Sequence, residues 1–251
     1  SLHRVLTMFN LLISIAAAAL ITVAVGIPLG QILYGIIPGI IVAIALFMSL
    51  GKIVSRKIEV IGQAFFDELQ VKNQLRPDPA RVERAVEILK TGYRYRHWHF
   101  MVGSMLDGQI GMAYYANKQF EKSEDYLVKS AWRHWVAKAM LGVTHYKKKR
   151  YESMKEVFEK ALKWNRKESF LWNLYAYCLS RSGDRTGAID VLSRCLEVLP
   201  GDSRTENNRS LVQKNKKMKM RSWDQLWYQF HLDTPPMPKM QMDRRGLYKG
   251  R

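Results

Sequence analysis

Two long runs of apolar residues stand near the start of the sequence, at 5–25 (VLTMFNLLISIAAAALITVAV) and 32–50 (ILYGIIPGIIVAIALFMSL). Neither contains a charged side chain, and each has about the 20 residues that a helix needs to cross a bilayer. The segment between them, GIPLGQ, is uncharged and rich in turn formers. Because backbone polar groups in lipid must bond within the chain, the pattern predicts a transmembrane helical hairpin over residues 1–54.

The alternative for the first run is a signal peptide. Its apolar stretch is too long for that reading, and a second apolar run follows at once. Basic residues flank the hairpin outside the turn, at His3 and Arg4 and at Lys52, Arg56 and Lys57. The positive-inside rule therefore predicts an integral protein of the inner or plasma membrane, with both termini and the remaining chain in the cytoplasm.

Small residues inside the second run, Gly35 and Gly39, have the spacing of a helix-packing motif. We expect them to pack the two helices of the hairpin against each other, and self-association is the alternative. Asn10, the one Asn in the first run, could form a side-chain hydrogen bond to another helix in the membrane.

After residue 52 the sequence is no longer continuously apolar, and its apolar residues recur at helical spacing among polar ones. Ile58, Ile61, Phe65 and Leu69 recur at spacings of three and four, which predicts a juxtamembrane helix that holds the next domain off the membrane. The segment Arg76–Pro79 ends it, because proline cannot continue a helix. A new helix is predicted from Pro79 to Gly92, with one apolar face: Val82, Ala85, Val86 and Leu89.

Two amphipathic stretches with a break between them occupy residues 169–202. Trp172, Tyr175, Ala176 and Leu179 share one helical face, and Gly183-Asp184 interrupts the pattern. A second stripe follows at Ala188, Leu192 and Cys195, and Pro200 ends it. The two alanines allow the helices to cross closely, which predicts a packed helical hairpin.

This order of residues resembles the tetratricopeptide repeat, whose pattern runs W, L, G, Y, A, F, A, P. A second copy lies one period of 34 residues upstream, with Leu141, Gly142, Phe158 and Ala161 in the matching slots; His145, Met154 and Arg166 depart from the pattern. A weaker third copy lies further upstream, 31 residues from the second, and its slots hold Gly111, Tyr114, Ser123, Leu127 and Ser130. The resemblance covers roughly residues 101–202.

The predicted fold is therefore all-α, a transmembrane hairpin followed by a solenoid of about three repeats and a polar capping helix over 203–221. The expected domains are a hairpin at 1–54, a juxtamembrane helix and linker at 55–78, a repeat domain with its cap at 79–221, and a basic, aromatic and extended tail at 222–251.

Charge and cysteine content narrow the class of partner. The chain of 251 residues carries 40 Lys and Arg against 22 Asp and Glu, a net charge of +18. Only Arg4 and Lys52 are formally charged before residue 55, so the excess belongs to the remaining chain. Such a balance favours anionic lipid, nucleic acid or acidic protein surfaces. Cys178 and Cys195 fall on apolar helix faces and are expected to be reduced core residues, which suits the cytosol.

No sequence motif for catalysis is present: there is no phosphate loop, no HExxH, no GxSxG and no Cys/His cluster. We therefore predict a non-enzymatic protein without cofactor or metal, and His97 and His99 lack the further ligands of a zinc site. The basic and aromatic stretch Tyr93–Phe100 is expected to seal the first repeat. Contact with single-stranded nucleic acid or with the membrane interface is the alternative.

The resemblance also implies a binding groove lined by the first helix of each pair. The groove residues that it implies are Met112, Tyr115, Val136, Ala139, Val143, Tyr146, Lys147, Phe170, Asn173, Tyr177 and Arg181. Their apolar and aromatic character predicts a hydrophobic or amphipathic helix as ligand. Family members that bind chaperones grip a terminal carboxylate with Lys, Asn and Arg side chains. Only Asn173 matches such a slot here, so this activity is not carried over.

The tail contains residues that need a surface to cover them. Trp223, Trp227 and Phe230 recur at helical spacing, and Lys216 and Lys217 precede them. These five are expected to contact the membrane, a partner or the protein's own groove.

The predicted function is a membrane-anchored scaffold whose cytoplasmic groove binds a protein partner, expected to be a subunit of a larger membrane complex. Membrane lipids are expected contacts. The alternatives are a basic membrane tether for RNA or ribosomes, through Tyr93–Phe100 and Lys214–Arg221, and a homo-oligomeric ring or pore.

Overall fold

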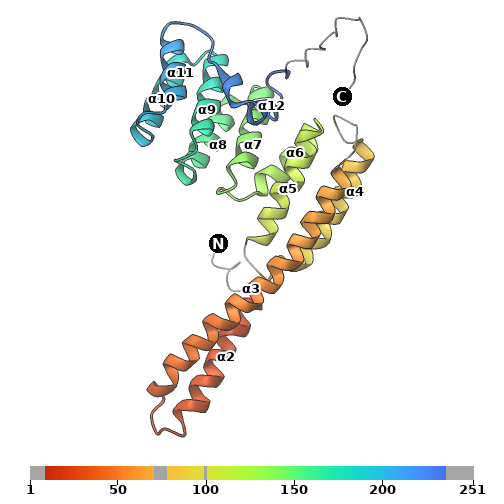
Figure 1. The fold of residues 1–251 in the computed structure, drawn as a ribbon, viewed down its shortest axis with the longest axis vertical. Coiled ribbons are helices and arrows are strands. Elements are labelled where there is room, and N and C mark those ends of the chain that lie inside the picture. The colour runs from red at the N-terminus through yellow and green to blue at the C-terminus, as the bar shows by residue number, and fades with distance from the viewer. Residues whose placement is uncertain (1–8, 71–77, 99–100, 236–251) are drawn as a thin grey trace, which may run out of the picture. The chain divides into compact units, whose positions relative to one another are not determined.

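The computed structural model describes residues 9–70, 78–98 and 101–235, and every regular element in these ranges is helical (Figure 1). The chain forms two compact units, Ser1–Arg166 and Lys167–Arg251. The helices of the first unit are α2 (Phe9–Gly26), α3 (Leu33–Leu69), α4 (Pro79–Lys90), η1 (Thr91–Tyr95), α5 (Val102–Ala116), α6 (Phe120–Lys129), α7 (Trp135–Lys147) and α8 (Tyr151–Trp164). Those of the second are α9 (Ser169–Arg181), α10 (Arg185–Val198), α11 (Ser203–Gln213), η2 (Met220–Trp223) and α12 (Gln225–Tyr228).

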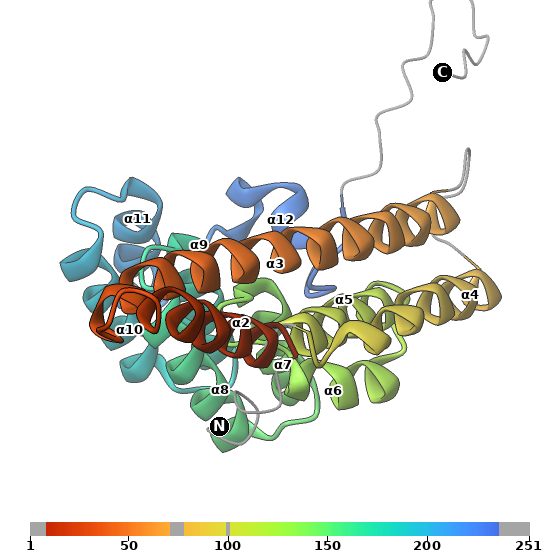
Figure 2. The same ribbon diagram turned by 90° about the horizontal axis from the view of Figure 1, so that it is seen from below.

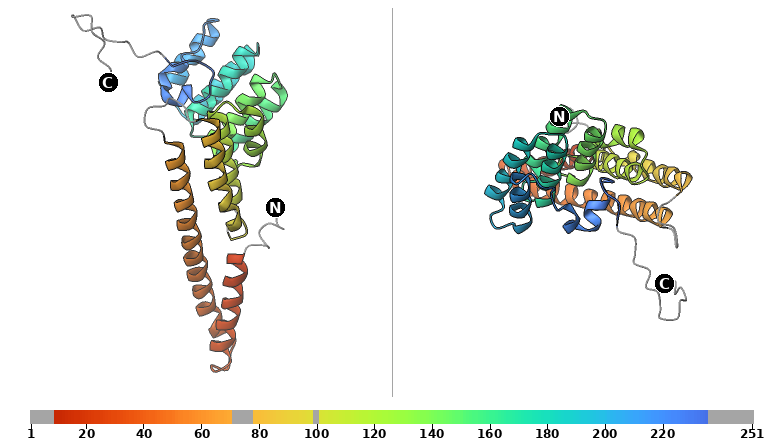
Figure 3. Two further views of the ribbon diagram at one scale, coloured as in Figure 1. Left: turned by 90° about the vertical axis from the view of Figure 1, so that its right-hand side faces the viewer. Right: turned by 90° about the horizontal axis from the view of Figure 1, so that it is seen from above.

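The predicted fold class is confirmed: two apolar helices precede a run of helix pairs. α2 and the first half of α3 lie side by side as a hairpin (Figure 3). A Cβ atom at Gly35 would overlap the backbone of Thr22, and one at Gly39 would overlap the Thr22 side chain and the Ala18 carbonyl. The two glycines therefore allow close contact inside the hairpin, as the sequence predicts.

α3 continues for 37 residues without a break, and its second half belongs to the core of the first unit. Val54, Ile58, Ile61 and Phe65 are buried in one apolar cluster with residues of α4 and α5, among them Val82, Val86, Leu89, Leu106 and Ile110. Figures 2 and 3 show α4 running beside this half of α3. The predicted stripe at Ile58, Ile61 and Phe65 is thus packed on α4 and α5, and the role of this helix in holding the repeats off a membrane stays a prediction.

The next four helices form two pairs, α5 with α6 and α7 with α8, and α7 also contacts both helices of the first pair. A glycine stands at each crossing. A Cβ at Gly111 would lie 2.7 Å from the Leu127 side chain, and one at Gly142 would lie 2.6 Å from the Phe158 ring. Larger residues there would push the paired helices apart. The crossing predicted from Gly142 and Phe158 is thus present.

Three loops of one geometry mark the repeating unit. Lys118, Lys149 and Gly183 each stand two residues after the first helix of a pair and have positive φ values of 62°, 57° and 98°. The next amide of each loop donates to the carbonyl five residues earlier at 2.9 Å, as in Gln119 to Tyr114, Arg150 to His145 and Asp184 to Leu179. This bond pattern satisfies carbonyls at the end of the first helix.

The length of α6 explains why the first period is 31 residues and not 34. α6 has 10 residues, whereas α8 and α10 have 14 each. The connection after α6, residues 130–134, is one residue longer than that after α8, residues 165–168. The shorter helix therefore accounts for the difference.

A buried lysine ends the short helix α6. Lys138 of α7 is 0 % exposed, and its Nζ donates to the carbonyls of Leu127 and Val128, each at 2.9 Å. The same Nζ lies 4.4 Å from the centre of the Trp132 ring. Burial lowers the pKa of Lys138 to about 8. Carbonyls at a helix end have no partner within the helix, and the Leu127 carbonyl also accepts from the amide and the hydroxyl of Ser130. Lys138 therefore adds to the C-terminal cap of α6 and joins α6 to α7.

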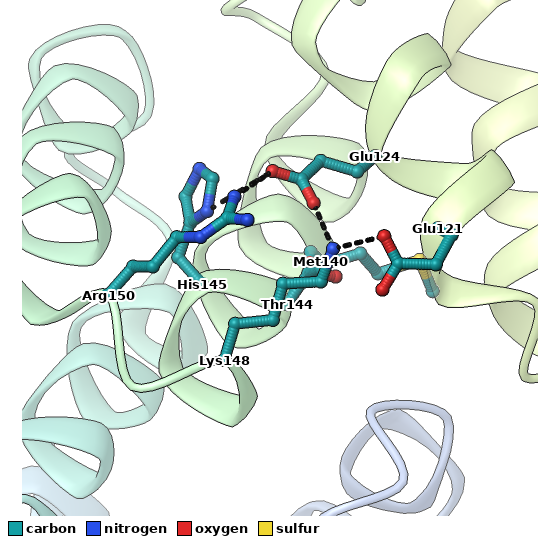
Figure 4. A network of polar contacts seen from close by, with 7 residues as sticks. All are labelled: Glu121, Glu124, Met140, Thr144, His145, Lys148 and Arg150. Carbon is teal, nitrogen blue, oxygen red and sulfur yellow. Dashed lines mark hydrogen bonds and ion pairs between the residues drawn. The ribbon is translucent and has the colours of Figure 1, made fainter.

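An ion-pair network connects α6 to the loop after α7 (Figure 4). Glu124 accepts hydrogen bonds from Lys148 at 2.5 Å and from Arg150 at 2.8 Å, and its Oε1 lies 3.6 Å from His145 Nδ1. Lys148 also donates to Glu121 at 2.6 Å. Partial burial raises the pKa of Glu124, whereas the hydrogen bond from Lys148 and the positive charges of Lys148 and Arg150 lower it. The net result is a lowered pKa. Burial is also the main reason that the pKa of His145 is lowered.

The second unit is built on the pair α9 and α10, and α11 packs against both. Ala176, Leu192 and Cys195 are buried at the crossing, and Cys178 is buried on α9. The predicted capping helix over 203–221 is corrected: α11 ends at Gln213, because Asn215 has a φ of 58° and the Lys216 amide turns back to the Leu211 carbonyl at 2.7 Å. The chain then forms the short helices η2 and α12.

Replacing Gly142 with Val should destabilise the protein by about 1–3 kcal/mol, because the added side chain overfills the crossing with Phe158. Thermal unfolding of the full chain in neutral detergent micelles measures the effect. Gly62 of α3 is the matched control, since a Cβ there meets nothing within 4 Å. Gly62→Val should retain the unfolding midpoint of the wild type. An equal fall of the midpoint in both variants would contradict a close helix crossing at Gly142.

Replacing Glu124 with Gln should cost about 1–2 kcal/mol at pH 7, between the values typical of exposed and buried ion pairs. Glu124 has a lowered pKa in the folded protein, so its contribution is complete above the ordinary glutamate value of about 4.3 and is lost as the pH falls through the folded value. The free energy of unfolding, measured with denaturant, should therefore differ between wild type and Glu124→Gln at pH 7, and this difference should be smaller below pH 4.

Glu152→Gln is the control for this experiment, because the Glu152 side chain is 90 % exposed and lies 3.7 Å from Lys155. It should leave stability unchanged at both pH values. A Glu124→Gln difference that stayed constant into acid would show that the carboxylate charge is not the source of the stabilisation.

Candidate functional site

The predicted groove residues of the first unit lie on α5 and α7, the first helices of the two pairs. Tyr115, Ala139 and Val143 are buried, whereas Met112, Val136, Tyr146 and Lys147 retain partial exposure. Lys147 Nζ lies 5.3 Å from the Tyr115 ring centre and 4.2 Å from that of Phe120, so the structure brings α5 and α7 together at this face. The partly exposed members form a mixed apolar and basic surface.

Two aromatic groove residues of the second unit are covered by the chain's own C-terminal segment. Phe170 on α9 contacts the rings of Trp223 and Phe230 at centroid distances of 5.6 and 5.4 Å. The Tyr177 ring receives Trp227 edge-on at 4.9 Å. Trp227 and Phe230 are buried, so the structure places these rings on α9 rather than on an open surface.

Asn173, the groove position between these two, is 0 % exposed and is held in a polar network. Its amide nitrogen donates to the Ser169 carbonyl at 2.9 Å and to Thr205 Oγ1 at 2.6 Å. Its amide oxygen accepts from Asn208 at 3.0 Å, and Asn208 in turn accepts from the Lys219 amide at 2.8 Å. Buried polar groups require such partners. Asn173 therefore fixes α11 and the segment at 219 to α9.

A cleft of about 880 Å³ lies beside this network, and its size is within the range of ligand pockets. Its walls are the C-terminal end of α9, the loop 215–219, η2 and the segment that follows α12. Arg181, Lys216 and Lys217, which the sequence marks as contact residues, all line it. The sequence marks Lys219 and Arg221 as part of the same basic stretch, 214–221, but it indicates neither Asp233 nor the position of this stretch beside α9, because no period links them.

The stretch predicted to seal the first repeat is engaged in packing as far as the structure describes it. The Tyr93 hydroxyl donates to Asp107 at 2.5 Å, and burial together with this bond raises the pKa of Tyr93. The Trp98 ring lies 5.8 Å from Phe9, whose amide donates to the His97 carbonyl at 3.0 Å. His99 and Phe100 lie outside the described residues, as does the tail after Pro235.

No metal site emerges among residues 9–70, 78–98 and 101–235, where no three His, Cys, Asp or Glu side chains gather as ligands. What the two units offer instead is a partly exposed inner face on α5 and α7 and a basic cleft beside α9.

Comparison with known proteins places one part of this architecture in a family. The model of a tetratricopeptide repeat matches residues 137–168, which span most of α7, all of α8 and the connection that follows. Neither the curated proteins nor the solved structures contain a match to the chain. Repeats of this kind are protein-interaction modules that typically lack catalytic activity. The chain thus contains a tetratricopeptide repeat, built from the pair α7 and α8 around Gly142 and Phe158.

Proposed function

We propose that this protein is a membrane-anchored docking scaffold, in which α2 and α3 hold the chain in a bilayer and the helix pairs bind a protein partner in the cytoplasm. The partner is a subunit of a larger membrane assembly. The observation that carries the proposal is the continuity of α3: its first half has an apolar exposed surface, and its second half is packed in the core beside the repeats. The anchor helix therefore continues into the core in which α5, one helix of the proposed docking surface, is packed.

Exposure of apolar side chains on the hairpin supports the anchor. Both helices are long and apolar enough to cross a membrane, yet only 17 % and 11 % of their most hydrophobic windows are buried. A core helix of a soluble protein has most of that surface covered. Ile37 and Ile41 of α3, for example, are 69 % and 61 % exposed. Apolar area left in water is costly, at about 25 cal/mol per Å², whereas lipid covers it.

The flanking charges support a cytoplasmic position for the repeats. Lys52, Arg56 and Lys57 follow the apolar half of α3, and the turn between α2 and α3 contains neither Lys nor Arg. Positive residues are retained on the cytoplasmic side of membranes. The repeat pairs follow on the same side as these residues.

The inner face of α5 and α7 is the docking surface that we propose. Repeat helices present such faces to peptides and helices. Met112, Val136 and Tyr146 supply apolar contact there, and Lys147 supplies a charge at its margin. In the second unit the equivalent face already carries Trp223, Trp227 and Phe230, so the first unit offers the partner more accessible surface.

The alternative functions receive less support from the geometry. A tether for RNA through residues 93–100 and 214–221 needs open ring faces, whereas Tyr93 is bonded to Asp107 and Trp98 packs on Phe9. Most of the basic stretch 214–221 lines the cleft beside α9. A homo-oligomeric ring or pore through the glycine seam needs Gly35 and Gly39 at the surface, whereas both are buried against α2.

Replacing Tyr146 with Ala should reduce recovery of the native partner at least about tenfold, because truncating a central aromatic residue of an interface typically costs more than 1.4 kcal/mol. Co-purification from solubilised native membranes, quantified by mass spectrometry, measures the change. Tyr151, whose ring lies 6.5 Å from that of Tyr146, supplies the control.

Tyr151→Ala removes a neighbouring ring from α8 and should retain the partner. Circular dichroism confirms that both variants fold. Full recovery of the native partner with Tyr146→Ala would show that the α5–α7 face is not the docking surface.

A further inference from the structure

We infer that the cleft beside α9 binds an acidic peptide segment, extended and rich in Asp and Glu, of a protein partner. The inference rests on the proposed scaffold function and adds the chemistry of the ligand. It starts from the arrangement of charge: five cationic side chains line the cleft, and Asp233 is the single acidic member of its lining. The cations are Arg181, Lys216, Lys217, Lys219 and Arg221.

Four of these cations lack an acidic counterpart within the described part of the chain. Arg181, Lys216, Lys217 and Lys219 form no ion pair there, and their side chains belong to exposed residues. Arg221 is different, because Asp233 accepts from its Nε at 2.8 Å and from its guanidinium at 3.1 Å. Asp233 therefore neutralises one charge of the five. Like charges gathered in a concave site attract a ligand of opposite sign.

The backbone that carries these cations is fixed on both sides. The Lys216 amide donates to the Leu211 carbonyl at 2.7 Å, and the Lys219 amide donates to Asn208 at 2.8 Å. Arg185 of α10 donates to the Val212 carbonyl at 2.7 Å and also to that of Gln213. A loop held in this way loses little backbone entropy when a ligand binds, so its charges are preorganised.

The floor of the cleft explains why a peptide fits better than a nucleic acid. Tyr177 and Trp227 are the aromatic residues of the lining, and they pack against each other edge to face at 4.9 Å. Trp227 is 2 % exposed, so it offers no face to a base. Binding of single strands depends on stacking of bases on open rings. Carboxylates need only the charged donors at the rim, with which they form strong hydrogen bonds.

Fluorescence anisotropy of a labelled eight-residue peptide of alternating Asp and Glu, added to the full chain in neutral detergent micelles, tests the inference. Lys216→Glu/Lys217→Glu should weaken binding at least tenfold, and Lys216→Gln/Lys217→Gln should weaken it less. The control, Lys163→Glu/Lys167→Glu, changes the net charge equally at two exposed residues outside the cleft, and it should bind within twofold of wild type.

Equal loss in the cleft variant and the control would reduce the effect to net charge and overturn the inference. So would the absence of peptide binding to wild type, or displacement of the peptide by a uridine decamer at equimolar concentration. Unfolding midpoints of all variants show whether the fold is kept, and the Gln variant replaces the Glu variant if the latter does not fold. The peptide-binding assay does not depend on recovery of the native partner. A negative result with the peptide would therefore overturn the acidic-ligand inference alone, and full partner recovery with Tyr146→Ala would count against the proposed docking surface alone.

Discussion

The rest of the structure depends on α3, one uninterrupted helix whose two halves differ in where their apolar side chains lie. Over its first half the helix is apolar on its exposed sides, with glycines where α2 approaches. Over its second half polar residues return and a single stripe from Val54 to Phe65 is buried against α4 and α5. In the arrangement that we propose, this continuous helix would hold a partner bound to the first pairs at a defined height above the bilayer.

Close approach of helices is the second recurring requirement. Gly35 and Gly39 serve it in the hairpin, and Gly111 and Gly142 serve it in the first two pairs. The loops between paired helices then repeat a single backbone conformation, with Lys118, Lys149 or Gly183 in the left-handed region. That two lysines adopt it, against the preference for glycine, indicates that the carbonyl-capping bonds of the loop compensate for the strain.

Sequence reasoning succeeded where a period of side chains decides the structure. The hairpin, the helix from Pro79 and the Gly142 crossing all depend on local pattern, and all are present. It failed where a contact joins residues far apart in the chain. Nothing near Asn173 shows that its amide would be bonded to Thr205 and Asn208, and nothing near Ile58 shows which helices its apolar stripe would be packed against. The end of α11 was misplaced because Lys and Gln continue a helix well, while Asn215 ends it through a conformation that composition does not show.

A spin-label accessibility scan along α3, in the full chain reconstituted in a bilayer, tests the central claim most directly. Cys178 and Cys195 are buried, and burial raises the pKa of the Cys195 thiol to about 11, so introduced cysteines are labelled preferentially. The account predicts that lipid-facing positions between Ile36 and Met48 are accessible to oxygen but not to a water-soluble nickel complex. From Ile53 to Leu69 nickel accessibility should oscillate with the helical period and reach minima at Val54, Ile58, Ile61 and Phe65. Nickel access throughout the first half, or loss of the period between the two halves, would contradict a single helix that joins the membrane to the repeat core.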